Sequence, residues 1–175
     1  MRINKNFIIK TLIYAFIAII FALFQTNINI DIEALGILNI KPNLIISLVI
    51  AACILENERY GAILGFVFGF VLDSGFGTSF VLSGIFYFFA AYLVGALTRT
   101  YFKKSLVTMA IAILPVCFVQ AIINLFYLIA LWDKFNFIDA LWKYIAPEFI
   151  YTIIFAPFVY LLLKFTAGKI SYNKI

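Results

Sequence analysis

The chain has 175 residues, of which 66% are hydrophobic and 12% are charged, and its formal net charge is +5. Soluble domains carry about 25% charged residues, so this composition excludes a water-soluble fold and indicates a polytopic membrane protein. The sequence has no histidine, which removes the commonest metal ligand and the usual general base. Cys53 and Cys117 lie inside apolar runs, which is typical of buried small residues and does not support a disulfide or a zinc site.

Six apolar segments follow one another and are predicted to be membrane helices, with approximate ranges 7–24, 37–55, 60–78, 80–98, 106–132 and 147–165, and the second begins at Ile37 or at Pro42. The first resembles a signal peptide, but no small-residue cleavage site follows it, so we expect a retained anchor. The second and third are short, and only residues 56–59 separate them. They are expected to form a tight helical hairpin or to be shallow or tilted. The whole pattern predicts an all-α membrane bundle of about six helices in a single domain, residues 1–175.

The distribution of Lys and Arg predicts the orientation of these spans, because basic residues concentrate in cytoplasmic loops. Six spans with an internal N-terminus place ten of the 13 basic residues inside, namely Arg2, Lys5, Lys10, Arg59, Arg99, Lys103, Lys104, Lys164, Lys169 and Lys174. Merging the second and third spans reverses this distribution, so we expect both termini in the cytoplasm. The basic edge then faces anionic lipid of the bilayer, and nucleic acid is not an expected partner.

Two external loops contain polar residues among apolar ones. The longest, from Gln25 to Lys41, is expected to be an interfacial turn or a partner contact. The loop from Asp133 to Lys143 is flanked by Trp132 and Trp142, which fit an aromatic belt at the membrane interface.

The third segment carries a stripe of small residues that ends in an acid. Gly61, Gly65, Gly69 and Asp73 are spaced four apart, so on a helix they lie along one side. Small residues at this spacing let another helix backbone approach closely inside a bilayer. Asp73 has two interpretations, which are a turn former near water and a buried acceptor that faces another helix or a partner.

The fourth segment repeats this pattern less regularly. Gly84, Tyr92 and Gly95 are candidates for helix packing or partner contact, although Phe88 interrupts the small-residue face. Helix packing is the expected function of this face.

Polar residues and prolines mark the last two segments. Gln120 and Asn124 lie one turn apart near the middle of the fifth, where buried amides favour hydrogen bonds between helices over ligand binding. Pro147 and Glu148 suit the first turn of the sixth helix, because proline needs no donor there and an acid suits the positive end of the helix dipole. Pro157 is expected to bend the same helix.

A series of short motifs is ordered along most of the chain. They are Pro42-Asn43-Leu44, Glu56-x-x-x-Tyr60-Gly61, Gly65-Phe66-x-x-Gly69-Phe70-x-x-Asp73, Gly84, Tyr92-x-x-Gly95, Pro147-Glu148 and Ala156-Pro157. In this order they resemble the MreD family of bacterial rod shape-determining membrane proteins. The core from Gly65 to Asp73 is the most specific part, and it is rich in phenylalanine where family members often have leucine.

The resemblance implies a multi-pass scaffold in the bacterial cytoplasmic membrane, without catalytic residues, metal or cofactor. Such a protein binds MreC and acts with MreB, RodA and a class B penicillin-binding protein in lateral peptidoglycan synthesis. The glycine stripe and Asp73 would then hold the bundle or receive a partner's transmembrane helix. The sequence also lacks the common enzyme signatures, such as GxSxG and GxxxxGK[ST].

The architecture is also similar to that of the substrate-binding subunits of energy-coupling-factor vitamin transporters. This alternative requires a polar vitamin pocket, lined by residues such as Asp73, Tyr92, Gln120, Asn124 and Trp142. It also requires a small-residue face for the coupling partner, which the first span offers only weakly through Ala15, Ala18 and Ala22.

Overall fold

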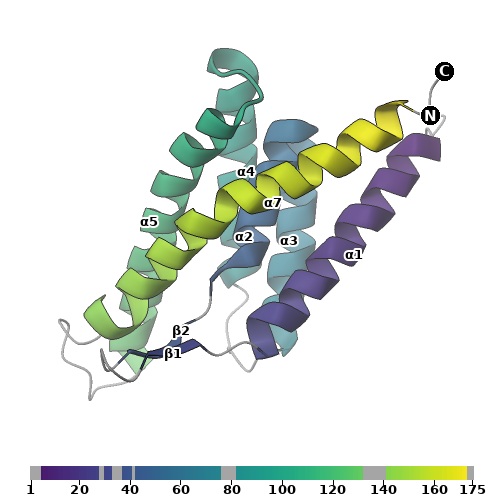
Figure 1. The fold of residues 1–175 in the computed structure, drawn as a ribbon. Helices are drawn as coiled ribbons and strands as arrows, with labels where there is room; N and C mark the ends of the chain where they lie inside the picture. Colours follow the sequence, from purple (N-terminus) through teal and green to yellow (C-terminus); the bar gives the residue numbers. More distant parts are fainter. Residues whose placement is uncertain are drawn as a thin grey trace.

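The computed structural model describes residues 5–27, 30–32, 37–40, 42–75, 82–131 and 141–172. Within these ranges the chain forms a bundle of six α-helices with a small pair of strands at one end (Figure 1). The helices are α1 (Lys5–Asn27), α2 (Leu44–Leu55), α3 (Glu58–Gly75), α4 (Leu82–Tyr101), α5 (Leu106–Leu131) and α7 (Ala146–Tyr172), and a π-helical turn, η2 (Leu141–Ile145), leads into α7. The predicted helical class is confirmed for the described residues.

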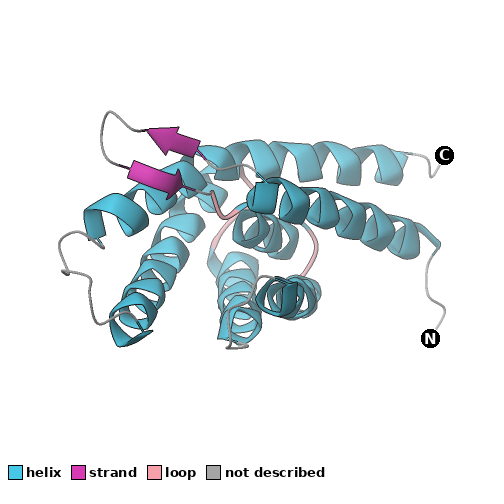
Figure 2. Cartoon of the chain, turned by 90° about the horizontal axis from the view of Figure 1, so that it is seen from below, coloured by secondary structure: helices cyan, strands magenta, loops and turns pink. Residues whose placement is uncertain are grey.

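The two strands were not predicted. β1 (Ile30–Ile32) pairs with β2 (Ile37–Ile40) in antiparallel orientation, with Ile30 opposite Ile40 and Ile32 opposite Ile37. The pair lies along the end of the bundle in Figure 2. Of the two starts predicted for the second segment, Ile37 and Pro42, the helix start at Leu44 lies near the second, because residues 37–40 are a strand.

Local chemistry explains this late helix start. Pro42 has no backbone N–H and disfavours helical conformation in the residue before it. Asn43 then caps α2, since its side-chain oxygen accepts a hydrogen bond from the backbone N–H of Ile46 at 3.0 Å. The helix consequently has only 12 residues.

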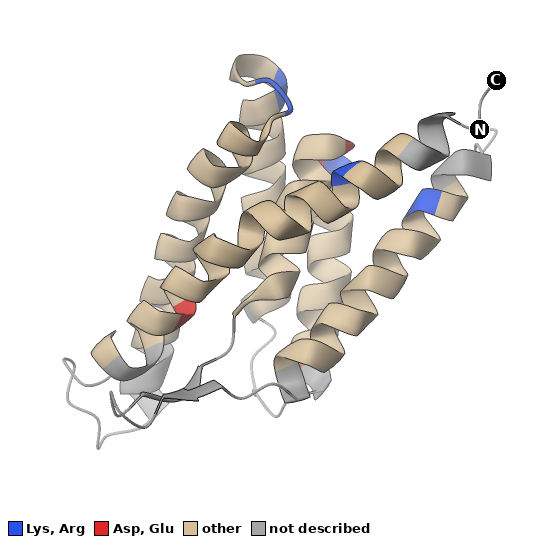
Figure 3. Cartoon of the chain, in the orientation of Figure 1, with Lys and Arg blue, Asp and Glu red and all other residues tan. Residues whose placement is uncertain are grey.

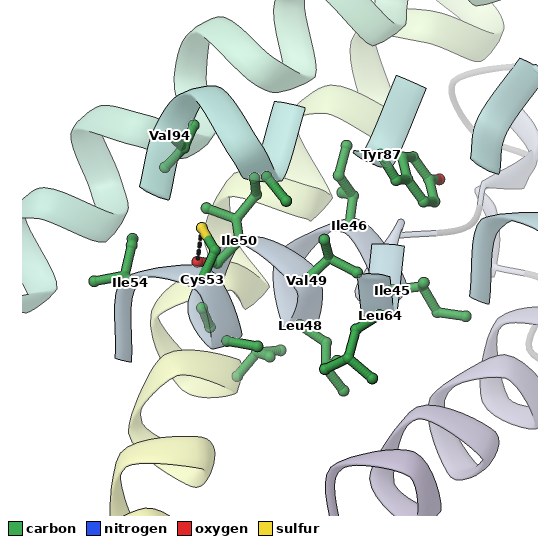
Figure 4. Close-up of a cluster of buried hydrophobic side chains, with 14 of the residues drawn as sticks. Ile45, Ile46, Leu48, Val49, Ile50, Cys53, Ile54, Leu64, Tyr87 and Val94 are labelled. Atoms are coloured by element: carbon green, nitrogen blue, oxygen red, sulfur yellow. Dashed lines mark hydrogen bonds between the residues drawn. The ribbon is translucent and has the colours of Figure 1, made fainter. Parts of the chain in front are cut away.

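The helix α2 is the centre of the bundle. At about 1.5 Å per residue it is about 18 Å long, which is short of the ~30 Å hydrocarbon core. Its residues from Ile45 to Ile54 are all buried, because α1, α3, α4, α5 and α7 pack around it. Figure 4 shows its side chains, among them Ile46, Val49 and Ile50, surrounded by Leu64, Tyr87 and Val94 from neighbouring helices. An apolar helix without a polar face suits this central position.

Three of the described helices are long and apolar enough to cross a membrane, over Ile8–Gln25, Leu106–Phe126 and Ala146–Gly168. The beginning of α1 and the end of α7 lie at the same end of the bundle, opposite the strands (Figure 1). In Figure 3 the ribbon segments coloured blue for Lys and Arg lie toward that end.

The connection between α2 and α3 is a tight turn, as one of the two alternatives for these segments predicted. α2 ends at Leu55 and α3 begins at Glu58. Glu56 in this turn forms an ion pair with Lys10 of α1 at 2.9 Å, and Glu58 forms one with Arg99 of α4 at 3.0 Å. The turn is thereby attached to two other helices.

Candidate functional site

The glycine stripe of α3 faces two helices of the same chain. A Cβ added at Gly61 would overlap Cys53 of α2, and one at Gly65 would lie 2.9 Å from both the carbonyl oxygen of Tyr87 and Cγ1 of Val49. A Cβ at Gly69 would lie 2.5 Å from the Cα of Gly84. These separations are shorter than ordinary contacts, so any side chain here would push α3 away from α2 and α4. The described chain itself therefore fills the stripe.

The glycines of α4 complete the same contact. A Cβ at Gly84 would lie 3.1 Å from the backbone oxygen of Phe66 and the backbone nitrogen of Phe70, and one at Gly95 would lie 2.6 Å from the Cα of Glu58. The two helices thus pack backbone against backbone at both ends. Tyr92 of α4 does not belong to this contact, because it is 46% exposed.

Asp73 is buried at the end of α3, with only 7% of its surface exposed. Its Oδ2 accepts a hydrogen bond from the backbone N–H of Ser83 at 3.0 Å. The first N–H groups of a helix lack partners within that helix, and a carboxylate also suits the positive end of the helix dipole. Asp73 therefore anchors the start of α4.

A cluster of polar side chains joins the helices at the centre of the bundle. The hydroxyl of Tyr87 on α4 accepts hydrogen bonds from Nδ2 of Asn43 at 2.7 Å and from Nε2 of Gln120 on α5 at 3.3 Å. The backbone N–H of Asn43 donates to Oγ1 of Thr152 on α7 at 3.0 Å. Asn43, Tyr87 and Thr152 are buried, so their hydrogen bonds are costly to break.

Glu148 extends this polar cluster toward the first turn of α7. Asn124 donates through Nδ2 to Glu148 Oε2 over 3.5 Å, and Thr152 donates through Oγ1 to the backbone oxygen of Glu148 at 2.7 Å. A cavity of about 10 Å³ lies between these side chains, with Asn43 and Gln120 also in its wall. This volume suits about one water molecule surrounded by polar partners. The arrangement can order water and bond helices, and it leaves no space for a larger molecule.

The remaining motif residues lie at helix ends and bends. Pro42 is buried just before α2, and Pro147 is buried in the first turn of α7. Pro157 lies inside α7, where it removes one helical hydrogen bond. Glu56 accepts hydrogen bonds from Lys10 Nζ at 2.9 Å and from the hydroxyl of Tyr14 at 3.2 Å.

Comparison with known proteins identifies the family. The model of the MreD family, described as rod shape-determining protein MreD, matches residues 6–166. The chain belongs to the MreD family. Searches of the curated proteins and of the solved structures found no match.

Membership in the MreD family supports a function in rod shape determination and a location in a membrane. The three long apolar helices agree with that location. In the described part of this MreD chain, no group of three His, Cys, Asp or Glu side chains is placed to hold a metal ion.

Sequence reasoning assigned no function to three members of the polar cluster in this MreD protein, which are Asn43, Tyr87 and Thr152, although Asn43 belongs to the Pro42-Asn43-Leu44 motif. Asn43 had a usable signal, because an asparagine directly before an apolar run is a common helix N-cap. No local pattern marked Tyr87 and Thr152, because each lies in an apolar helix and its hydrogen-bond partner comes from a distant segment. Trp142, which the transporter alternative required in a pocket, is 67% exposed.

Proposed function

We propose that this chain is a non-enzymatic scaffold of the bacterial cell-elongation machinery, in the cytoplasmic membrane. In this proposal it crosses the membrane six times with both termini in the cytoplasm and binds MreC. Through MreC it would connect to MreB, RodA and a class B penicillin-binding protein, and so help organise lateral peptidoglycan synthesis. Membership in the MreD family supports the function in shape determination. The six spans, the orientation and the named partners are what we propose.

One structural observation carries the scaffold assignment. The central polar groups bond helices to one another, and the cavity between them has a volume of only about 10 Å³. A ligand site for a small molecule needs about 300–1,000 Å³. The central polar residues hydrogen-bond helices to one another, and this supports a protein that acts by binding other proteins.

The same observation weighs against a vitamin-binding transporter subunit. Gln120 and Asn124 line the small cavity, whereas Asp73 bonds to the start of α4 and Tyr92 lies on the outside. These four residues therefore do not share a pocket in the described structure. Calorimetric titration of the purified chain with a panel of vitamins tests this alternative, and binding in the micromolar range would favour it.

Because the glycine stripe of α3 is already packed against α2 and α4, a partner helix would have to bind another surface of the bundle. Tyr92 lies midway along α4, about 15 Å from either helix end at 1.5 Å per residue. Its side chain is 46% exposed, and its hydroxyl has no hydrogen-bond partner among the described residues. A hydroxyl in hydrocarbon without a partner is unfavourable, so a partner's transmembrane helix with an acceptor would stabilise it. We therefore place the MreC contact on the outer face of α4.

Co-purification of MreC with the full chain tests this contact. Tyr92→Phe removes only the hydroxyl and is expected to reduce recovered MreC by about threefold to tenfold, the equivalent of one hydrogen bond. Tyr101→Phe is the matched control, because Tyr101 is 75% exposed at the end of the same helix. Equal recovery of MreC with both variants would exclude the Tyr92 contact. Failure of the unmodified chain to recover any MreC, together with normal rod shape in its absence, would refute the scaffold proposal.

A further inference from the structure

A second, much larger cavity lies at the end of the bundle where the basic residues gather. Its volume is about 490 Å³, within the ~300–1,000 Å³ range of small-molecule sites. The α2–α3 turn, the last turns of α4 and the connection from α4 to α5 form its wall. In Figure 3 the ribbon is coloured blue for Lys and Arg at this end of the molecule.

The charges around this cavity favour an anion. Its two acids already have cationic partners, since Glu56 pairs with Lys10 at 2.9 Å and Glu58 pairs with Arg99 at 3.0 Å. Lys103 and Lys104 also line the cavity, and they add two positive charges that no acid of the wall balances. Amines and guanidinium groups in such a wall bind phosphate well.

The two lysines differ in how they are held. Lys104 donates through Nζ to the backbone oxygen of Leu55 at 2.6 Å, which fixes it above the end of α2. Lys103 is exposed, and its ammonium group has no hydrogen bond or ion pair within the described ranges. Lys103 is consequently free to contact a ligand.

The cavity also has an apolar side. Cys53 and Ile54 in its wall are buried, and Phe102 is 47% exposed beside the two lysines. A phospholipid combines these features, because its charged phosphate lies next to the first carbons of its acyl chains. The cytoplasmic leaflet, where basic residues concentrate, is also the one that is rich in anionic lipid.

We propose that this cavity binds the phosphate of an anionic phospholipid head group, with Lys103 as its main contact. A soluble phosphate would satisfy the same charges, but the exposed phenylalanine and the membrane location favour the lipid. The proposal does not depend on the proposed MreC contact, because Tyr92 is not part of the cavity wall.

Native mass spectrometry of the full chain in detergent tests the proposal, with phosphatidylglycerol compared with phosphatidylcholine of the same acyl chains. We expect retention of phosphatidylglycerol, and about fivefold weaker retention in Lys103→Gln, since one basic residue near a membrane surface contributes about that factor. Lys164→Gln is the control, because Lys164 is an exposed lysine outside the cavity wall. Equal binding of the two lipids, or equal loss in both variants, would overturn the proposal.

Two further measurements separate the possible explanations. Lys103→Arg keeps the positive charge and is expected to retain phosphatidylglycerol, so a loss as large as that in Lys103→Gln would contradict a charge-based site. Inorganic phosphate at millimolar concentration is expected to leave lipid retention unchanged. Displacement of the lipid by inorganic phosphate would instead assign the cavity to a soluble ligand and refute the lipid proposal.

Discussion

The carboxylate of Asp73 accepts a hydrogen bond from the backbone N–H of Ser83 at 3.0 Å, across the connection between α3 and α4. One buried acid thus attaches the end of one helix to the beginning of the next. The same two helices are in backbone contact at Gly69 and Gly84, one turn away. The cap and the glycine contact together position α4 against α3.

Removal of this cap is expected to destabilise the bundle. Asp73→Ala should lower the free energy of unfolding by about 1 kcal/mol, because the N–H of Ser83 loses its acceptor. Asp73→Asn keeps a side-chain oxygen and should cost less. Thermal unfolding in detergent measures both variants. An equal loss in Asp73→Asn and Asp73→Ala would show that the charge, and not the hydrogen bond, matters.

Because α3 and α4 are in backbone contact, substitution of glycine by alanine is expected to change stability by very different amounts at different positions. Gly69→Ala should cost about 1–3 kcal/mol of stability, because its Cβ would meet the backbone of Gly84. Gly168→Ala on α7 is the control, since nothing lies within 4 Å of a Cβ there. It should be neutral or slightly stabilising, because alanine favours helix. Unfolding midpoints that fall equally in both variants would contradict the close-contact argument.

Removal of the hydroxyl group is expected to have different effects on stability at two buried tyrosines, Tyr87 and Tyr160. Tyr87→Phe should cost about 1–3 kcal/mol, because Asn43 and Gln120 lose the acceptor of their hydrogen bonds. Tyr160 is equally buried, but its hydroxyl has no hydrogen-bond partner in the described structure. Tyr160→Phe should therefore be neutral or stabilising. Chemical denaturation distinguishes the two, and an equal effect would mean that the Tyr87 hydrogen bonds contribute nothing.

The ion pair at the α2–α3 turn predicts a pH dependence. A backbone N–H at the start of α3 and the Arg99 guanidinium hold the pKa of the Glu58 carboxyl below its usual range. A carboxyl whose pKa is lower in the folded state stabilises that state at neutral pH, and this contribution disappears as the pH falls through the folded pKa. Glu58→Gln should thus be less stable than the unmodified chain at pH 7, and the difference should shrink in acid. A difference in unfolding midpoint that stays constant from neutral pH into acid would exclude this contribution.

The helical class and the membrane location could be predicted from the sequence because both depend on composition. A chain with 66% hydrophobic residues cannot expose its surface to water, and apolar runs in lipid must satisfy their backbone groups as helices. The spacing of Gly61, Gly65 and Gly69 also depends only on the period of a helix. The small-residue face therefore follows from the order of the residues alone.

Only the tertiary structure determines which helix faces pack against one another. The sequence predicted a short apolar span that begins at residue 37 or 42, and only its position among five other helices shows that it is the buried centre. Likewise, the bond from Asn43 to Tyr87 joins residues 44 positions apart, which no local pattern encodes. Composition and periodicity act along the chain and thus determine what each segment is. Hydrogen bonds and close backbone contacts depend on which segments meet, so only the folded bundle determines what Asp73, Tyr87 and Glu148 do.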